Sequence, residues 1–197
     1  MLLKDKLNGH RLILASGSPR RRQILADAGV SFVPAEPYEV DEVWPAGMAA
    51  ADVAIYLAGL KSDAYPRELA AGDILLTADT TVVVDDRVLG KPSGEAEAVE
   101  MLSALSGRAH RVITGVVLRT ATGRQSFAAE SAVWFRTLSP EEITYYVTNF
   151  KPFDKAGAYA IQEWIGHVGI TRIEGSFYNV MGLPIQMIYS NLNIMIS

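Results

Sequence analysis

The sequence predicts a mixed α/β fold in which a mixed sheet is flanked by helices. Short apolar runs typical of strands alternate along the chain with segments that carry apolar residues at helical spacing. Some strands follow each other as hairpins across short polar turns, so the sheet must contain antiparallel as well as parallel pairs. Hydrophobic residues make up 49% of the 197 residues, which is enough for a continuous core, and we expect one domain over residues 1–197.

The first predicted elements are a strand over residues 12–15 and a helix directly after it. Ser18 suits the N-cap of this helix, and Gly29 suits its end. Pro19 suits the first helical position, because the N–H that proline lacks would be unpaired there. Residues 30–33 predict a second strand. The segments after it are an irregular acidic stretch and a helix, over residues 34–47 and 48–64.

The rest of the chain is predicted to hold two hairpins and three helices. Asp85 and Asp86 suit the turn of the first hairpin. Ser139 and Glu142 have the spacing of a capping box, which marks the start of a helix. The predicted strands are residues 73–77, 81–84, 88–89, 111–120 and 126–136, and the predicted helices are residues 93–105, 139–149 and 184–192.

Composition and charge exclude several classes of function. The formal net charge is −4, which argues against broad attraction to nucleic acid or to an anionic membrane. The chain has no cysteine, so disulfides, zinc–thiolate sites and cysteine nucleophiles are excluded. The charged N-terminus lacks the apolar segment of a secretion signal, and no apolar stretch approaches the roughly 20 residues that span a bilayer. We therefore expect a cytoplasmic protein with neither nucleic acid nor membrane as a partner.

Residues 16–22 carry the first candidate binding chemistry. Arg20 and Arg21 begin a run of three arginines in the first turns of a predicted helix, where the helix dipole disfavours cations. A bound polyanion would reverse this effect, because free N–H groups, the hydroxyls of Ser16 and Ser18, and the guanidinium groups would all face phosphate oxygens. The alternative is an exposed basic helix face.

Asp79 and two lysines are further candidates. Asp79 lies where an apolar strand ends, a position at which carboxylates of α/β enzymes bind metals or act as bases, although turns also use aspartate there. Lys91 lies in a rigid Gly-Lys-Pro turn that suits phosphate binding, and a solvated lysine is the alternative. Lys61, in the predicted helix over residues 48–64, leaves the same two possibilities.

Residues 154–162 combine small residues with charged and polar ones. Small residues let a backbone approach a ligand closely, and a tight structural turn explains Gly157 equally well. A turn explains Asp154, Lys155 and Gln162 less well, which makes these three residues candidates for binding.

In their order along the chain, these segments resemble the Maf family of nucleotide pyrophosphatases. The resemblance rests on residues 16–21 (SGSPRR), 78–80 (ADT), 90–92 (GKP), 105–108 (LSGR), 154–159 (DKAGAY), 161–162 (IQ) and 180–184 (VMGLP). Each motif alone is unspecific, whereas the ordered set is highly specific and spans nearly the whole chain. The resemblance implies a fold like that of inosine triphosphate pyrophosphatases, with two lobes and a central cleft, and frequently a homodimer.

The resemblance also implies a reaction. Family members hydrolyse nucleoside triphosphates to the monophosphate and pyrophosphate with a divalent metal cation, Mg²⁺ or Mn²⁺. The subgroup that acts on dTTP and UTP is most similar, because DKAGAY and IQ occur here, and modified pyrimidine nucleotides are further candidate substrates. The family's proton acceptor corresponds to Asp79, and its acidic residue and helix lysine correspond to Glu42 and Lys61. The positions linked to base choice correspond to Arg20, Thr80 and Gln162.

A metal-bound triphosphate needs cations for its phosphates and carboxylates for the metal, and the motifs offer both. We expect Asp79 to activate the attacking water or to bind the metal. The candidate metal ligands are Glu42, Asp79 and Asp154. The candidate substrate-binding residues are Ser16, Ser18, Arg20, Arg21, Lys61, Thr80, Lys91, Lys155 and Gln162.

Two positions depart from the family's pattern, and two other functions stay open. Glu163 replaces the usual glycine after Gln162, and Ser62 stands where the helix motif LAxxKA has alanine.

The alternative enzyme is a 7-methyl-GTP pyrophosphatase. The alternative outside enzymes is a nucleotide-binding regulator without turnover, since family members have been linked to septum formation and cell division arrest.

Overall fold

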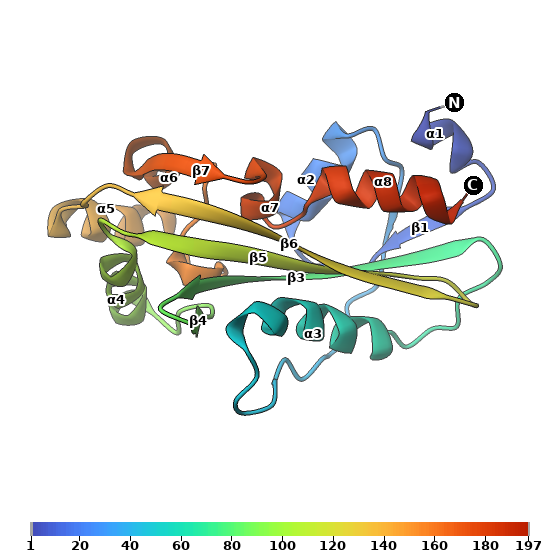
Figure 1. Ribbon diagram of the computed structural model, residues 1–197, viewed down its shortest axis with the longest axis horizontal. Helices are drawn as coiled ribbons and strands as arrows, with labels where there is room; N and C mark the ends of the chain where they lie inside the picture. Colours follow the sequence, from blue (N-terminus) through green and yellow to red (C-terminus); the bar gives the residue numbers. More distant parts are fainter. Residues whose placement is uncertain (1, 197) are drawn as a thin grey trace.

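The computed structural model describes residues 2–196 and has a mixed seven-stranded sheet with helices on both faces (Figure 1). Its strands are β1 (Arg11–Leu14), β2 (Val33–Pro34), β3 (Asp73–Val84), β4 (Arg87–Leu89), β5 (Ala109–Arg119), β6 (Arg124–Phe135) and β7 (Ile170–Glu174). The main order is β2-β1-β3-β5-β6-β7, and β4 pairs with β3. Among the strands of residues 2–196, β1 alone makes parallel pairs, with β2 and β3, and the other pairs are antiparallel. The predicted mixed sheet flanked by helices is confirmed.

The long strand β3 has an interruption in the pairing along one edge. On one side, β5 pairs with it continuously from Leu75 to Val83. On the other side, the β1 pairs end at Leu76 and the β4 pairs begin at Val82. Between these two residues the edge of β3 is open, so the side chains on both of its faces are accessible from one cleft.

The prediction of two strands, over residues 73–77 and 81–84, was wrong, because the structure has the single strand β3. The polar residues between the apolar runs do not end the strand. Thr77 Oγ1 donates to the carbonyl oxygen of Ala58 at 2.8 Å, and Asp79 accepts a hydrogen bond from Lys61. These partners, together with β5, satisfy the polar groups, so Asp79 lies in mid-strand and not at a strand end.

The helices cover the two faces of the sheet. They are α1 (Leu3–Lys6), α2 (Pro19–Asp27), α3 (Ala50–Asp63), α4 (Glu95–Leu105), α5 (Pro140–Phe150), α6 (Trp164–Gly169), α7 (Phe177–Met181) and α8 (Ile185–Met195), with a 3-10 turn, η1 (Ala156–Ala158). Helix α3 lies on one face and α2, α7 and α8 lie on the other (Figure 1). Helix α3 is very close to β5, because a Cβ at Gly115 would lie 2.4 Å from the backbone of Ile55. This close contact places the last turn of α3 beside the middle of β3.

Two large apolar clusters meet β3 on either side of Asp79. One cluster includes Ile74 and Leu76 and packs against β1, α2 and α8. The other includes Val82 and Val84 and packs against α4 and α5. The polar middle of β3 therefore lies between two apolar halves of the molecule, which is where a cleft can form without opening either core.

All five predicted helices and both predicted hairpins are confirmed to within a few residues. Asp85 and Asp86 form the hairpin turn with φ of 49° and 56°. The predicted strand over residues 30–33 was wrong in extent: β2 is only Val33–Pro34, and Val30 packs in the core behind α2. The short elements α1, η1, α6, β7 and α7 were not predicted. Within residues 2–196, no helix combines the length and the apolar character needed to cross a membrane.

Candidate active site

A cleft of about 730 Å³ opens at the interrupted edge of β3. This volume lies in the range of sites for small molecules. All of the predicted site residues except Lys155 line it, and they come from the β1–α2 segment, the loop before α3, α3, β3, the turn after β4 and the segment around η1. The fold therefore brings together residues that lie far apart in the sequence.

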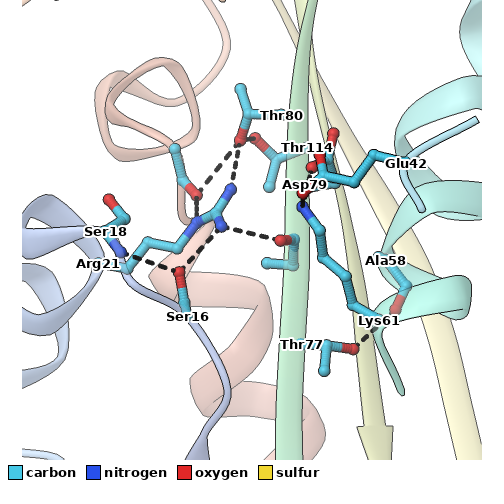
Figure 2. Close-up of polar contacts among 12 residues, drawn as sticks. Ser16, Ser18, Arg21, Glu42, Ala58, Lys61, Thr77, Asp79, Thr80 and Thr114 are labelled. Carbon is cyan, nitrogen blue, oxygen red and sulfur yellow. Dashed lines mark hydrogen bonds and ion pairs between the residues drawn. The ribbon is translucent and has the colours of Figure 1, made fainter. Parts of the chain in front are cut away.

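On the α3 face of β3, one lysine holds two carboxylates (Figure 2). Lys61 Nζ donates a hydrogen bond to Asp79 Oδ1, and it lies 3.1 Å from Glu42 Oε1. The Asp79 and Lys61 side chains are largely buried, whereas Glu42 is 43% exposed, on the loop before α3. Two carboxylates that share one ammonium group must lie close to each other, which concentrates negative charge at the edge of the cleft.

The carboxylate groups of Glu42 and Asp79 are suitable ligands for a divalent cation. Mg²⁺ is commonly held by one or two carboxylates, with water and substrate phosphate oxygens as the remaining ligands. Among residues 2–196 there is no cluster of three or more histidine, cysteine, aspartate or glutamate residues arranged for a metal. A cation held by Glu42 and Asp79 would therefore take its other ligands from substrate and water.

On the opposite face of β3, Arg21 joins three segments of the chain (Figure 2). Its Nε donates to the carbonyl oxygen of Gly182 at 2.8 Å, and its Nη1 donates to the carbonyl oxygen of Ala78 at 2.8 Å and to Ser16 Oγ at 3.2 Å. Its Nη2 donates to Thr80 Oγ1 at 3.0 Å. Within the described part of the chain no carboxylate forms an ion pair with Arg21, although the charges of Asp79 and Glu42 favour its positive charge from a distance. Burial lowers the pKa of Arg21, but guanidinium stays protonated in proteins.

A second group of charges surrounds Asp154. Arg20 Nη1 lies 3.6 Å from Asp154 Oδ2, and Lys155 Nζ lies 2.7 Å from Asp154 Oδ1. Lys155 Nζ also lies 3.4 Å from Glu163 Oε1, and its side chain is only 9% exposed. Burial opposes ionisation of Asp154, but the hydrogen bond from Lys155 and the charges of Lys155 and Arg20 together lower the pKa of Asp154. Lys155 thus lies behind the cleft wall, and Asp154 lies apart from the Lys61 group.

Gln162 and Lys91 lie on the remaining wall. Gln162 Oε1 is buried and has no hydrogen-bond partner among residues 2–196. Lys91 is exposed on the turn after β4, and the neighbouring carbonyl oxygen of Gly90 accepts from Gly157 N at 3.0 Å. A Cβ at Gly157 would lie 2.9 Å from the side chain of Val82, so only glycine lets η1 pack this closely on β3.

Sequence reasoning missed Trp44 and the roles of Glu163 and Tyr38. Trp44 lines the cleft and is 37% exposed. The sequence feature that could have pointed to Trp44 is a large aromatic residue in an otherwise acidic and irregular segment. Tyr38 Oη donates to the carbonyl oxygen of Lys61 at 2.7 Å, which ties the loop before α3 to the helix end. Glu163 was visible only as a departure from a family pattern.

The fold and the cleft define an α/β protein whose site gathers arginines, lysines and carboxylates for a small anionic ligand. The chain belongs to the Maf family: the family described as "Maf-like protein" matches residues 11–195. The chain is 50% identical over 186 residues to the "dTTP/UTP pyrophosphatase" of Bacteroides thetaiotaomicron, covering 94% of this chain and 96% of that protein. It is 44% identical over 196 residues to the "dTTP/UTP pyrophosphatase" of Christiangramia forsetii, covering 100% of both.

A further relative carries the same description. The "dTTP/UTP pyrophosphatase" of Parabacteroides distasonis is 45% identical over 188 residues, which cover 95% of this chain and 97% of that protein. Among solved structures, "Structure of a HAM1 protein from Coxiella burnetii" matches with a TM-score of 0.40 and 17% identity over 64% of this chain and 73% of that chain. A likeness at this level carries no argument, so the predicted likeness to inosine triphosphate pyrophosphatases stays a prediction.

Proposed function

We propose that the protein hydrolyses dTTP and UTP, and modified pyrimidine nucleotides of the same type, to the monophosphate and pyrophosphate. The observation that carries this proposal is the single cleft in which Lys61 joins Asp79 to Glu42 while Arg20, Arg21 and Lys91 supply cations. The descriptions of the relatives, which share 44–50% identity over nearly the whole chain, support the same substrates.

The reaction would begin with a water molecule beside Asp79. The Asp79 carboxylate accepts a proton as the water oxygen attacks the α-phosphorus in line with the bond to the bridging oxygen. The α-phosphorus–oxygen bond breaks, and the electron pair leaves on pyrophosphate. Lys61 orients Asp79 through its hydrogen bond. In the alternative role, Asp79 acts mainly as a metal ligand.

The cations of the cleft would bind the triphosphate. Lys91 and Arg20, which also lies 3.6 Å from Asp154 Oδ2, line the cleft and can contact phosphate oxygens. Ser16 and Ser18 offer hydroxyl groups at the start of α2, and Lys155 acts through Asp154. Glu42 and Asp79 would hold Mg²⁺ or Mn²⁺, and the ion would offset negative charge on the phosphate oxygens. Asp154, paired with Arg20 and Lys155, would join the metal ligands only if it exchanged these partners.

Base choice would depend on Gln162, Thr80 and Arg20. A carboxamide carries both a donor and an acceptor, which suits the imide edge of thymine and uracil. We also propose a single-domain cytoplasmic protein that forms a homodimer and has a nucleotide substrate, with neither nucleic acid nor membrane as a partner.

The test is to incubate the protein with each nucleoside triphosphate and Mg²⁺ or Mn²⁺ and to separate the products by anion-exchange chromatography. We expect dTMP or UMP with pyrophosphate and no diphosphate, and we expect chelation of the cation to stop the reaction. Preference for 7-methyl-GTP would favour the alternative enzyme. Triphosphate binding without any product would favour the regulator and would contradict the proposal.

A further inference from the structure

The guanidinium group of Arg21 donates nearly all of its hydrogen bonds to other residues of the protein. Arginine has five N–H donors, and four of them are engaged by Gly182, Ala78, Ser16 and Thr80. At most one N–H is left for a ligand. Arg21 therefore cannot bind phosphate as a two-pronged fork, although its sequence position predicted a substrate ligand.

The hydroxyl group of Ser16 can take part in only one kind of hydrogen bond with a ligand. Ser16 Oγ accepts from Ser18 N at 3.3 Å and from Arg21 Nη1 at 3.2 Å. A hydroxyl oxygen has two lone pairs, so both are occupied. Within residues 2–196 the Ser16 proton has no acceptor, and Ser16 lines the cleft. Ser16 can therefore only donate to a ligand.

The hydroxyl group of Thr80 has the opposite polarity. Thr80 Oγ1 accepts from Arg21 Nη2 at 3.0 Å and lies 2.9 Å from Thr114 Oγ1. Either hydroxyl group could donate in this contact, but Thr114 has the nearer carbonyl acceptor, Asn179 O at 3.2 Å. We therefore assign the Thr114 proton to Asn179 and the Thr80 proton to Thr114. The carbonyl oxygen of Gly182, at 3.4 Å, is a second acceptor for the same Thr80 proton. With this assignment one lone pair of Thr80 is left, so Thr80 can only accept from a ligand in the cleft.

We propose that Arg21 is a positioning residue that fixes these two polarities, so that Ser16 donates to a phosphate oxygen and Thr80 accepts the imide N3–H of uracil or thymine. The proposal deepens the proposed function and rests on it. Cytosine has an unprotonated N3, which would face the Thr80 lone pair as a second acceptor. Two facing acceptors leave a buried polar group unpaired, which is an effective means of discrimination. The Gln162 carboxamide would then donate through its Nε2 to a neighbouring base carbonyl group.

The experiment compares four variants that act on one guanidinium network. The measurements are kcat/KM for UTP and CTP, and calorimetric binding of the hydrolysis-resistant α,β-imido analogues of both nucleotides. Thr80→Val should lower kcat/KM for UTP at least about tenfold. It should not lower kcat/KM for CTP, because it removes the acceptor that faces cytosine N3, whereas Thr80→Ser keeps the UTP to CTP ratio. Ser16→Ala should lower kcat/KM and analogue binding by the same factor for both nucleotides. Lysine cannot reach both hydroxyl groups. Arg21→Lys should therefore lower kcat/KM and analogue binding for both nucleotides, and it should also lower the UTP to CTP ratio.

Thermal unfolding of each variant checks that it is folded, and two further results make the test decisive. Wild-type protein should use 3-methyl-UTP, which lacks the N3 proton, at least about tenfold less well than UTP, whichever variants fold. An unchanged UTP to CTP ratio in folded Thr80→Val or Arg21→Lys, or equal use of 3-methyl-UTP and UTP, overturns the inference and leaves the proposed function intact. If wild-type protein releases no product, the proposed function fails, and the binding of the two analogues still decides the polarity of Thr80.

Discussion

Lys61 at the end of α3 and Asp79 in the middle of β3 are joined by a direct hydrogen bond between ammonium and carboxylate. The contact exists because two features coincide. The edge of β3 is open between the pairs made by β1 and β4, and α3 approaches β5 so closely that only glycine fits at position 115. The Asp79 carboxylate is thereby fixed in orientation and still accessible from the cleft, as a general base or metal ligand must be.

Asp79→Asn should lower kcat for UTP by at least about 100-fold while the protein stays folded. An amide cannot take the proton of the attacking water, and general-base catalysis typically contributes factors of this size or larger. The measurement is product release by chromatography, with thermal unfolding as a check on the fold. Asp86→Asn is the matched control, because Asp86 lies on the exposed β3–β4 turn and the charge change is the same. Near-normal turnover by Asp79→Asn would remove Asp79 from the mechanism.

Gln162→Ala should lower the ratio of UTP to GTP hydrolysis by about five- to tenfold. The substitution removes one carboxamide from the cleft wall, and one hydrogen bond contributes about 1 kcal/mol. The ratio is the correct readout, because loss of general packing would slow both nucleotides alike. The matched control is Gln23→Ala, since Gln23 Nε2 donates to Asp27 Oδ1 on the exposed surface of α2, away from the cleft. The role of Gln162 in base choice is wrong if the ratio does not change.

The stability of the protein should fall between pH 6.5 and pH 4 because of His110. His110 is 3% exposed, its Nε2 lies 2.7 Å from Tyr159 Oη, and burial lowers the pKa of His110 to about 4. The unfolded chain, with a histidine pKa of about 6.5, takes up the proton first. The contribution is therefore complete above pH 6.5 and is lost as the pH falls toward 4, by about 3 kcal/mol at the lower limit.

The check on His110 is the difference in melting temperature between wild type and His110→Phe as the pH is lowered. Whatever its stability at neutral pH, the melting temperature of the variant should fall less steeply than that of wild type. His167→Gln, at an exposed position, should keep the wild-type slope. Parallel slopes for wild type and His110→Phe would show that acid sensitivity comes from other groups.

Features encoded by neighbouring residues could be predicted from the sequence. The capping box at α5 is present, with Ser139 Oγ accepting from Glu142 N and Glu142 Oε2 accepting from Ser139 N. The ordered motifs also predict residues that line one cleft, with the exception of Lys155. Both signals are local, because a cap or a motif depends on a few adjacent positions.

Features that depend on partners distant in sequence could not be predicted. β3 continues through Thr77 and Asp79 because Ala58 and Lys61 satisfy their side chains, and nothing in residues 73–84 reveals these partners. Helix α7 has only five residues and is held by Asn179, whose Nδ2 donates to Val112 and Ser131. Short elements of this kind have little stability of their own, so tertiary contacts decide whether they form.

Tyr146→Phe should destabilise the protein by about 1–3 kcal/mol. The Tyr146 ring is fully buried, and its hydroxyl group donates to Glu163 Oε2 and accepts from Ala160 N at 3.2 Å. Burial, followed by the hydrogen bond to Glu163, raises the pKa of Tyr146, so the hydroxyl group stays protonated and keeps its role as donor. Phenylalanine leaves a buried N–H and a carboxylate oxygen unpaired, and such groups cost about this much.

The adjacent Tyr145 provides the control for Tyr146. Tyr145 is 49% exposed, and within residues 2–196 its hydroxyl group has no hydrogen-bond partner, so Tyr145→Phe removes the same atom at almost no cost. The measurement is the free energy of unfolding from denaturant titrations of both variants. Equal stability of the two variants would mean that the Tyr146–Glu163 contact contributes nothing. If only Tyr146→Phe lowers the free energy of unfolding, the result explains how the chain accommodates glutamate at position 163. The Glu163 carboxylate then has the buried Tyr146 hydroxyl group as a donor on one side and Lys155 on the other.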